Sequence, residues 1–486
     1  MIYKLRPYQE ECVKSISDYI NSDRHDPVLI VGPVGCGKSL LIAEAARLMG
    51  DKTLILQPSK ELLQQNHDKI TSYGIPATIY SASCGKKELS NMIYATLGSI
   101  KKVVDKLKEM GIRNVLIDEA HAGYSPEDGS EFMTFMNELK PKKVIGFTAT
   151  PCRLKNMSIG QTSYSQLNFI TRMRPVYFKN LIHVIQVEEM IRQGFWTPLK
   201  YETWDFNGDA LKLNSNGSEY TAESISEAVR KNGLNNLILR RLMVLKDVCR
   251  SILVFMDSVE SCNTAAEWMN AKICAGMAEV VHGGTPKKQR EAIVERFKSG
   301  GTRVVFNYSA LGTGFDHPGL DCVIVGRPTF SFSSFYQWLG RAVRIKDGKD
   351  SALVVDCCNN SSRFGDIRKL SIENYKGYGW GMFIGDKLIT NIPMGDKVTK
   401  TDLDIKAAKK DRRRGLAQGV TAAPVPGRPD HPLGSTVMTF GKYCGWMLHS
   451  IPVSYLKFIN ETFDWDNDRN KDIKEYIDFL IKNNRL

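Results

Sequence analysis

Short runs of apolar residues recur along the first two thirds of the chain, and each run is followed by a stretch with the helical period. The first four runs are VLIVG (28–32), TLILQP (53–58), NVLIDEA (114–120) and KVIGFTAT (143–150). Continuous apolar strands that alternate with helices are typical of a parallel sheet covered on both faces. The pattern predicts an α/β domain over residues 1–155.

The same alternation restarts further along the chain. Five more runs follow: SILVFMDS (251–258), AEVVHG (278–283), TRVVFNYS (302–309), DCVIVGRP (321–328) and ALVVDCC (352–358). We interpret them as a second α/β domain over residues 236–370, and the less regular residues 156–235 as a connecting region. Two parallel-sheet domains in tandem, with a cleft between them, account for the pattern.

The composition changes after the second domain. Residues 406–414 (KAAKKDRRR) form a basic run, and residues 419–434 (GVTAAPVPGRPDHPLG) are rich in Pro, Gly and Ala without periodicity. Segments of this kind are typical of flexible linkers. We therefore expect an extension with a basic, Pro/Gly-rich linker over residues 371–434, and a small C-terminal module over residues 435–486.

Charge and cysteine content narrow the class of protein. The chain has 486 residues and a formal net charge of +13, so a polyanion suits it better as a partner than a polycation does. Its 11 cysteines include no Cys-x-x-Cys pair, which argues against a zinc ribbon or a disulfide framework. The first residues carry charges, and no stretch is long and apolar enough to cross a bilayer. We expect a cytoplasmic protein without membrane association.

A phosphate-binding loop follows the first apolar run. The residues GPVGCGKS (32–39) have the spacing Gly-x-x-x-x-Gly-Lys-Ser between a strand and the helical pattern KSLLIAEAARLM. Backbone N–H groups from Gly35 through Gly37 to Ser39 are expected to cradle the β-phosphate of ATP at the helix N-terminus. Lys38 is expected to reach the β- and γ-phosphates, and Ser39 to ligate Mg²⁺. Cys36, inside the loop, is interpreted as a small residue without a chemical role.

Two carboxylates follow the third apolar run, in the sequence VLIDEAHAG. A carboxylate at the end of a buried strand is costly unless it has a charged or polar partner. Beside a phosphate-binding loop, Asp118 is expected to hold Mg²⁺ through water, and Glu119 to polarise the attacking water. His121 is either structural or reports the nucleotide state to the second domain. Thr148 and Thr150, in TAT after the fourth run, are uninformative by themselves.

The order of these motifs resembles that of superfamily 2 helicases and translocases over about residues 3–360. Nine stretches carry the resemblance, in chain order: LRPYQ (5–9), PSKELLQQ (58–65), ATLGSI (95–100), DEAH (118–121), TAT (148–150), LVFMDSVESC (253–262), VHGGTPKKQREAIVERFKSG (281–300), ALGTGFDHP (310–318) and QWLGRAVR (337–344). The resemblance implies two RecA-like domains, an α/β fold, and a catalytic site divided between them.

The resemblance also implies roles for residues outside the phosphate-binding loop. Gln9, with Arg6 nearby, corresponds to the adenine-recognising element, and Gly314 and Asp316 belong to the nucleotide site. Gln337, Arg341 and Arg344 are implied to complete the catalytic site from the second domain. We expect Arg341 and Arg344, three residues apart on a helix, to project from one face toward the γ-phosphate. His121, Thr148 and Thr150 are implied to couple the nucleotide to the second domain.

A nucleic acid is the implied track. The residues that correspond to phosphate contacts are Ser59, Lys60, Thr96, Ser99, His282, Gly283 and Thr313. Small side chains let main-chain N–H groups approach phosphate without reading bases, so we expect weak sequence preference and strong salt dependence. The form QWLGRAVR is closer to DNA-directed members, such as phage branch-migration helicases of the UvsW type, bacterial RadD-like helicases and restriction-enzyme motor subunits. We therefore expect a DNA helicase or translocase.

Several alternatives stay open from the sequence. An RNA helicase is one, and a nucleotide-switched DNA-binding ATPase without unwinding is another. Residues 155–180 are either a strand-separating wedge or an ordinary connection, and the run 406–414 is either a solvated tether or a secondary DNA contact. In the C-terminal module, Lys442, Tyr443 and Trp446 either stack on bases and bind phosphate, or Trp446 and Tyr455 lie inside a small core. We favour the small core. The module is also a possible contact for protein partners.

Overall fold

The computed structural model describes residues 4–50, 52–159, 162–311, 315–407, 431–439, 443, 446–462, 465 and 470–486. These residues form two compact units. The first unit comprises Met1–Tyr375 with Gly379–Val398, and the second comprises Lys376–Tyr378 with Thr399–Leu486. The expected linker falls largely within residues 408–430, which lie outside the described residues.

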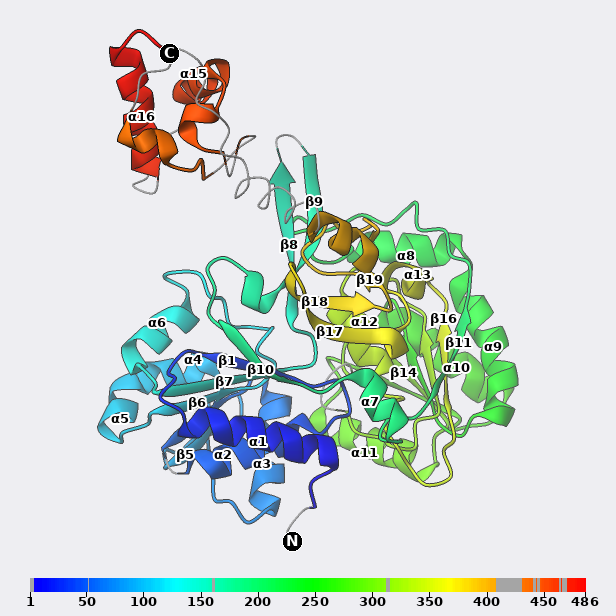
Figure 1. The fold of residues 1–486 in the computed structure, drawn as a ribbon. Coiled ribbons are helices and arrows are strands. Elements are labelled where there is room, and N and C mark those ends of the chain that lie inside the picture. Colours follow the sequence, from blue (N-terminus) through cyan, green and yellow to red (C-terminus); the bar gives the residue numbers. More distant parts are fainter. Residues whose placement is uncertain are drawn as a thin grey trace. The chain divides into compact units, whose positions relative to one another are not determined.

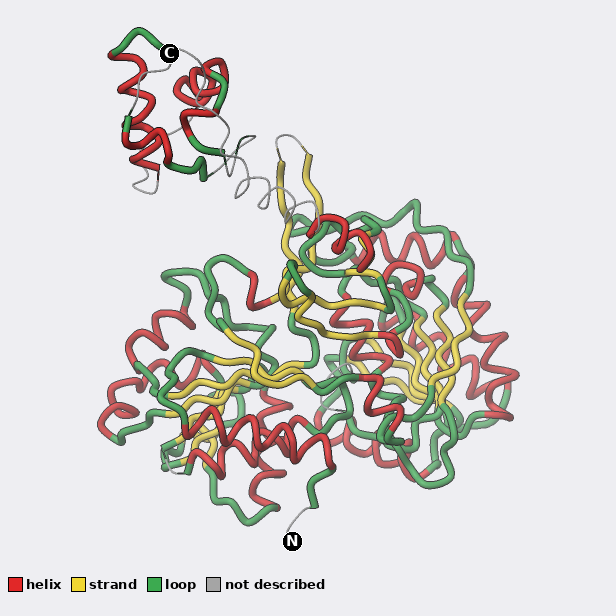
Figure 2. The backbone as a smooth tube through the Cα atoms, in the orientation of Figure 1, coloured by secondary structure: helices red, strands yellow, loops and turns green. Residues whose placement is uncertain are grey.

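The first unit begins with an eight-stranded sheet whose central strands are the four apolar runs near the front of the chain (Figures 1 and 2). Neighbouring strands are parallel except for the last pair, β3 and β4. In sheet order the strands are β10 (Asn180–Val184), β1 (Val28–Val31), β7 (Lys143–Thr148), β6 (Asn114–Ile117), β2 (Thr53–Leu56), β5 (Met92–Ala95), β3 (Thr78–Ser81) and β4 (Lys86–Lys87).

Helices follow most of these strands, as parallel crossovers require. Ser59 caps the helix after β2, because its side chain accepts a hydrogen bond from the Leu62 N–H at 3.3 Å, and Ser130 caps a later helix in the same way. The helices of this domain are α1 (Pro7–Asn21), α2 (Lys38–Met49), α3 (Lys60–Ser72), α4 (Leu97–Ile100), α5 (Val104–Glu109) and α6 (Glu131–Leu139).

The second sheet has six strands, and all of its neighbouring pairs are parallel. Its strands, in sheet order, are β11 (Leu199–Thr203), β16 (Ala352–Asp356), β15 (Cys322–Val325), β12 (Ile252–Phe255), β14 (Val304–Tyr308) and β13 (Ala278–His282). Its helices are α8 (Ala222–Lys231), α9 (Leu234–Val248), α10 (Val259–Lys272), α11 (Lys287–Ser299), α12 (Phe332–Leu339) and α13 (Asn360–Phe364). The predicted α/β fold with two tandem parallel-sheet domains is confirmed.

The connecting region is more regular than its sequence indicates. It contributes β10 to the first sheet, α7 (Val187–Arg192), and β11 to the second sheet. Between β7 and β10 it also forms an antiparallel hairpin of β8 (Cys152–Ile159) and β9 (Thr162–Phe169), which projects as a long two-stranded arm in Figure 1.

Residues after the second sheet form a further, smaller sheet. Its strand order is β17 (Leu370–Tyr375), β18 (Gly379–Ile384), β19 (Lys387–Leu388) and β20 (Val398–Thr399). The Gln186 side chain ties this sheet to the first domain, because it donates to Ile372 O at 2.8 Å and accepts from Ile372 N at 3.2 Å. Met382 and Ile384 belong to the same buried apolar cluster as the first sheet. The front part of the expected extension is therefore folded structure.

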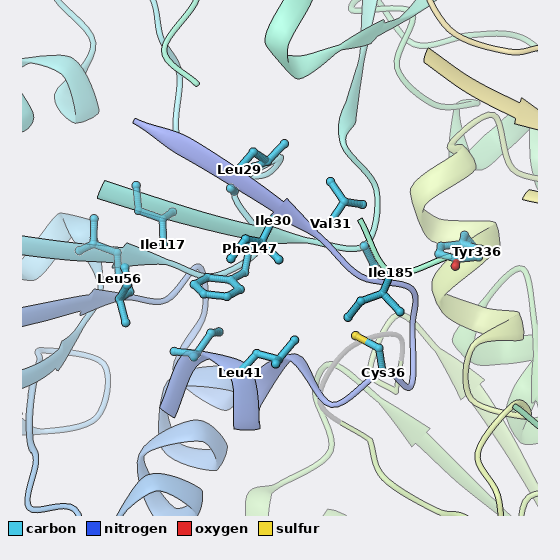
Figure 3. Packing of buried hydrophobic residues seen from close by; sticks show 14 of the residues in the cluster. Leu29, Ile30, Val31, Cys36, Leu41, Leu56, Ile117, Phe147, Ile185 and Tyr336 are labelled. Carbon is cyan, nitrogen blue, oxygen red and sulfur yellow. The ribbon is translucent and has the colours of Figure 1, made fainter. Parts of the chain in front are cut away.

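One apolar cluster runs from the first sheet to one face of the second domain. It includes the fully buried strand β1, the α2 residue Leu41, and Tyr336 from α12. Figure 3 shows these residues around the start of α2, with Ile185 and Cys36 between the strand and α12. The other face of the second sheet packs against α8, α9 and α10 in a separate cluster. The two sheets are therefore held together by shared apolar packing.

The second unit has a core of its own. Two short helices, α15 (Val453–Thr462) and α16 (Lys471–Lys482), pack around Leu448, Ile451 and Tyr476. Trp446 does not join this core and is 45% exposed, so the expectation that it lies inside is wrong. Its ring stacks edge-on against Tyr443 instead, and Tyr455 is half-buried. Lys442 lies outside the described residues.

No helix among the described residues has the length and apolar character needed to span a bilayer.

Candidate active site

A cavity of about 460 Å³ lies between loops of the first and second sheets. It is lined from the first domain by the phosphate-binding loop and the end of β6, and from the second domain by α12 and the turn that follows it. Twelve residues predicted from the sequence line it: Arg6, Gln9, Gly35, Gly37, Lys38, Ser39, Asp118, Glu119, Asp316, Gln337, Arg341 and Arg344. Sequence positions more than 300 residues apart therefore meet around one hollow.

The phosphate-binding loop owes its shape to two glycines. Gly35 and Gly37 have φ of +84° and +83°, in the left-handed region where side chains are strained. They turn the chain from β1 into α2, so that the first N–H groups of the helix face the cavity. The Cys36 side chain points the other way and is fully buried, next to Ile185 in Figure 3. Cys36 acts here through its backbone carbonyl rather than its thiol.

Lys38 and the two carboxylates, Asp118 and Glu119, form a hydrogen-bonded cluster. Lys38 Nζ lies 2.8 Å from Glu119 Oε1. Asp118 Oδ2 accepts a hydrogen bond from the Asn66 amide at 2.9 Å, and Ser39 Oγ donates to Asn66 Oδ1 at 2.6 Å. Glu119 itself has φ of +46°, a strained conformation for a residue with a side chain. The turn brings both carboxylates to the same end of the strand.

Burial and charge shift the pKa values of these groups in opposite directions. Burial, followed by the neighbouring Glu119 carboxylate, raises the pKa of Asp118 to about 6. Burial also acts to raise the pKa of Glu119, but the Lys38 ammonium and then His121 outweigh it and lower that pKa. For Lys38 itself, burial opposes the charged form, whereas Glu119 and Asp118 favour it and raise its pKa. Glu119 therefore stays ionised and able to accept a proton or orient water.

Arg6 and Gln9, which are expected to recognise adenine, pack directly against the phosphate-binding loop. Gln9 Nε2 donates to Cys36 O at 2.9 Å, and Gln9 Oε1 accepts from the Arg6 N–H at 2.9 Å. The Arg6 guanidinium lies 4.7 Å from the centre of the Phe195 ring. An amide has two donor hydrogens and two acceptor lone pairs, so Gln9 keeps one of each for another hydrogen-bonding partner.

The two arginines reach the cavity from a turn, not from a helix as expected. Helix α12 ends at Leu339, and Arg341 N donates to Trp338 O at 3.2 Å in the turn that follows. Thr197 then straightens the chain, because its N–H bonds to Val343 O and its hydroxyl to Arg344 O, each at 2.7 Å. The predicted helical face is wrong, although the prediction that both side chains reach one site is correct.

Each arginine already has a partner in the second domain. Arg341 Nη1 donates to Phe315 O at 2.7 Å, and the Arg344 guanidinium pairs with the Asp316 carboxylate. Burial, followed by repulsion from Arg344, lowers the pKa of Arg341 to about 10. The buried Arg341 and the half-buried Arg344 thus line the same cavity as Lys38 and Glu119.

A chain of hydroxyl and imidazole contacts joins the domains beside the cavity. His121 Nδ1 lies 2.8 Å from Thr148 Oγ1 and 3.3 Å from Glu119 Oε2. Ser333 Oγ, in α12, lies 3.2 Å from His121 Nε2 and 3.1 Å from Thr150 Oγ1. Two of the three residues expected to couple the domains, His121 and Thr150, therefore contact one serine of the second domain, and Thr148 reaches it through His121.

The residues expected to contact nucleic acid lie outside the cavity, at carboxyl ends of strands. Ser59 and the exposed Lys60 follow β2, whereas Thr96 and Ser99 follow β5 and are hydrogen-bonded to each other at 3.2 Å. His282 ends β13 and is followed by the exposed Gly283. Thr313 and Gly314 lie outside the described residues.

Four residues of the site were not predicted from the sequence: Asn66, Phe195, Trp196 and Ser333. Asn66 bridges Ser39 and Asp118, and the Trp196 indole donates to Val34 O at 2.7 Å. Asn66 lies on the helical repeat of α3 without a motif of its own. Trp196, in the apolar stretch GFW before β11, was detectable as an aromatic residue but not as a contact of the phosphate-binding loop.

Two family models match the chain. Residues 2–153 match the model described as type III restriction enzyme, res subunit, and residues 235–346 match the helicase conserved C-terminal domain. These matches contain all twelve of the predicted residues that line the cavity. The chain belongs to the superfamily 2 helicases and translocases.

Relatives of the chain support the same family. A 51.5 kDa protein of a Lactococcus phage is 25% identical over 68% of this chain and 65% of its own length. The DNA 3′-5′ translocase XPB2 of Sulfurisphaera tokodaii is 25% identical over 72% of this chain and 81% of its own length. The chain spans less than two thirds of the length of the first relatives that it matches.

A solved structure has the same fold. An ATP-dependent type ISP restriction-modification enzyme, LlaBIII, bound to DNA, superposes with a TM-score of 0.53 at 15% identity. The match covers 86% of this chain and 30% of the restriction enzyme. The comparison supports the fold.

Proposed function

We propose that this protein is an ATP-dependent DNA helicase or translocase that couples ATP hydrolysis to movement on DNA. The observation that carries the proposal is the cavity between the two sheets, which brings Lys38 and Glu119 from the first domain to face Arg341 and Arg344 from the second. A hydrolytic site divided between two domains links the state of the nucleotide to their relative position.

In this proposal the phosphate-binding loop holds the triphosphate. The N–H groups from Gly35 to Ser39 bind the β-phosphate, and Lys38 exchanges its contact with Glu119 for the β- and γ-phosphates. Gln9 offers its remaining donor and acceptor to the adenine edge, while Arg6 and Phe195 pack beside it. ATP is the nucleotide that the family uses.

Mg²⁺ fits the oxygen atoms gathered beside Lys38. Ser39 and Asp118 share a hydrogen-bonding partner in Asn66, so their oxygens lie on the same side of the loop. Hard oxygen donors suit Mg²⁺, which keeps most of its water and binds substrate phosphates. We infer that Ser39 and Asp118 would hold the ion, which would neutralise phosphate charge, while Asn66 keeps both residues in position.

The hydrolytic step divides between Glu119 and the two arginines. Glu119 remains ionised beside Lys38 and is proposed to orient the attacking water. Arg341 and Arg344 would stabilise the charge that develops on the γ-phosphate, and Gln337 lies on the same wall of the cavity. In the structure Asp316 forms an ion pair with Arg344. In the proposed step Arg344 would leave Asp316 and bind the phosphate. Loss of the γ-phosphate then removes an interaction that holds the domains together.

The contacts around Ser333 are proposed to couple the nucleotide to the track. His121 touches both Glu119 and Ser333, so a change at the catalytic carboxylate reaches α12 through one side chain. Thr148 and Thr150 hold His121 and Ser333 from the other side. The track itself would run over Ser59, Lys60, Thr96, Ser99, His282, Gly283 and Thr313.

DNA is the proposed track, with RNA as the alternative that the test below separates. The form of QWLGRAVR and the translocase relative, whose name specifies DNA, support this choice. We also propose that duplex or branched DNA is remodelled, as in branch migration, recombination or repair, and that the β8–β9 hairpin separates strands. Its base is held near the catalytic carboxylates, because Arg153 donates to Ala120 O at 3.1 Å and Tyr124 O at 2.6 Å.

Steady-state ATPase measurements test the substrate. The assay compares no nucleic acid, single-stranded DNA, duplex DNA, a four-way DNA junction and single-stranded RNA, at low and moderate salt. Stimulation by duplex or junction supports a DNA-remodelling motor. Stimulation by RNA alone would mean that RNA, and not DNA, is the track. If none of the nucleic acids stimulates the ATPase, an ATP-switched binding protein is favoured.

Replacing Arg344 by alanine tests the divided site. We expect turnover to fall by about 10³-fold or more, because the lost guanidinium stabilises transition-state charge, while binding of a fluorescent ATP analogue stays within about threefold. The matched control is Arg230→Ala, an exposed arginine on α8, which should leave both values unchanged. Unchanged turnover in Arg344→Ala would contradict the proposal that residues of both domains hydrolyse ATP together.

A further inference from the structure

The amino edge of the first sheet carries a row of cations. Lys52 immediately precedes β2, Arg113 precedes β6, and Lys142 precedes β7, and these three strands are neighbours in the sheet. Backbone hydrogen bonds hold the row in register, because Arg113 N donates to Lys52 O at 3.1 Å and Lys142 N to Arg113 O at 2.7 Å. Strand spacing of about 4.8 Å makes this row about 10 Å long.

Two hollows open on this edge, with volumes of about 540 and 340 Å³. They share Gly111, Arg113 and Lys142, so the two form one continuous surface. Six basic residues line them: Lys52, Lys108, Arg113, Lys140, Lys142 and Lys143. No carboxylate among the described residues lines either hollow.

The charge of this surface is largely uncompensated. Within the described parts of the chain, Arg113, Lys140 and Lys142 are exposed and have no ion pair within 4 Å. Lys108 pairs with the exposed Asp105 at 3.0 Å, and an exposed pair of this kind contributes little.

Lys143 is different from the other five cations. It is buried, and its ammonium donates to the carbonyls of Tyr19, Ser22 and Arg24 at 2.9, 2.7 and 2.6 Å. These bonds close the end of α1 against the sheet, so Lys143 has a structural role. It remains a charge beneath the surface, and burial followed by repulsion from Lys142 lowers its pKa.

We propose that this amino-edge surface binds the phosphate backbone of a second nucleic-acid segment, distinct from the segment on the proposed track. The choice of nucleic acid over another polyanion rests on the proposed function. It agrees with the charge density of duplex DNA, which carries about six phosphates in the 10 Å that the row spans. The hollows also lack aromatic residues, so they suit backbone contact without base recognition.

The position of the surface makes it independent of the track. Asp118 and Ser59 follow the carboxyl ends of β6 and β2, whereas Arg113 and Lys52 precede the amino ends of the same strands. A strand of four residues separates these edges by about 13 Å. The motor would then hold one arm of a branched DNA on the amino-edge surface. At the same time it would move another arm over the carboxyl ends of the strands.

A charge-reversal variant tests the proposal. Arg113→Glu, Lys140→Glu and Lys142→Glu are combined, and the control combines Arg230→Glu, Arg250→Glu and Lys272→Glu, which are exposed and change the net charge equally. Binding of a four-way junction is measured by fluorescence anisotropy between about 50 and 200 mM salt. We expect the slope of log K against log salt to fall by about 2 to 3 in the test variant relative to the control.

Two further measurements keep the outcome decisive. ATPase stimulated by a short single strand, which occupies the track alone, should match the control, and the milder Arg113→Gln, Lys140→Gln, Lys142→Gln variant should lose salt slope in the same direction. An equal slope in test and control variants overturns the proposal. If the wild type binds poly-glutamate more tightly than DNA and the test variant loses that binding, the ligand of the amino-edge surface is an acidic protein and not a nucleic acid. Failure of the proposed function would instead appear as wild-type ATPase that no nucleic acid stimulates.

Discussion

At the scale of single residues, the phosphate-binding loop meets the second domain at Gly340. A methyl group built on Gly340 would lie 2.5 Å from Val34 Cγ2, well inside contact distance. Gly340 has φ of −60°, which any residue adopts, so the glycine is needed for space and not for backbone conformation. The turn that carries Arg341 therefore lies this close to the phosphate-binding loop only because residue 340 has no side chain.

Replacing Gly340 by alanine should separate the two halves of the active site. Because the added methyl pushes Val34 away from the turn that carries Arg341, we expect kcat to fall by about tenfold or more. Binding of ATP should change less than kcat, since the N–H groups expected to hold the phosphates begin at Gly35, after the displaced Val34. Turnover and nucleotide binding are measured on the same preparation.

The clash itself supplies the control. In the double variant Val34→Ala with Gly340→Ala, the space for the new methyl returns, and we expect most of the turnover to be recovered, with a coupling energy well above additivity. Val34→Ala alone should stay close to wild type. Wild-type turnover in Gly340→Ala would contradict the close approach of loop and turn.

Residues of the site that belong to motifs could be predicted, and those that act through packing could not. Lys38, Asp118 and Arg344 have spacings that chemistry dictates, and all three line the cavity. Asn66 and Ser333 are common residues on amphipathic helices, and a helical repeat does not say which polar side chain faces a carboxylate. The helix expected at Arg341 failed for a related reason, because Thr197, distant in sequence, straightens that segment.

At the scale of elements, most of the apolar strands were predictable and the half-polar ones were not, although the short buried strand β5 was also missed. All nine apolar runs became strands, because a strand buried on both faces must be apolar throughout. The missed strands β8 and β9 alternate polar and apolar residues outside the parallel sheets, and β17 to β19 form a separate antiparallel sheet. Their pairing depends on neighbours that a single run of sequence does not reveal.

The β8–β9 hairpin offers an element-scale prediction about unwinding. Residues 157–164 are replaced by Asn-Gly, so that Asn156 and Ser165, which face each other across the hairpin, flank a two-residue turn. We expect displacement of a DNA strand to fall by about tenfold or more while DNA-stimulated ATPase stays within about twofold. The physical reason is that the base of the hairpin, with Arg153, is untouched and the projecting part is gone.

Translocation provides the control for this variant. Displacement of streptavidin from biotinylated single-stranded DNA reports movement without strand separation, and it should persist in the shortened protein. Unimpaired duplex unwinding would show that the hairpin is a connection and that strands are separated elsewhere.

At the scale of the whole molecule, the two units have separate cores. The buried residues of the first unit's apolar clusters reach as far as Ile384, whereas the core of the second unit begins at Met438. The change of composition near residue 395 indicated this division in the sequence. It did not indicate that residues 370–375 and 379–398 belong to the first unit, because the packing partner of this sheet lies near Gln186, far away in the chain.

Truncation tests this division. A chain that ends at Ala407 keeps β17 to β20, and we expect its basal and DNA-stimulated ATPase to stay within about twofold of the full chain. A chain that ends at Leu370 is the matched comparison. It loses the buried Met382, Phe383 and Leu388 and should be destabilised by several kcal/mol, about 2 to 5 for each large apolar side chain removed.

Calorimetry of the same proteins separates the units thermodynamically. The second unit buries nine described apolar residues in its core, and a core of this size supplies about 3 to 5 kcal/mol. The full chain should therefore show a small transition at lower temperature, which the chain ending at Ala407 lacks, and an unchanged main transition. A single transition that shifts on truncation would mean that the second unit stabilises the motor, and the size of the shift in Tm would measure by how much.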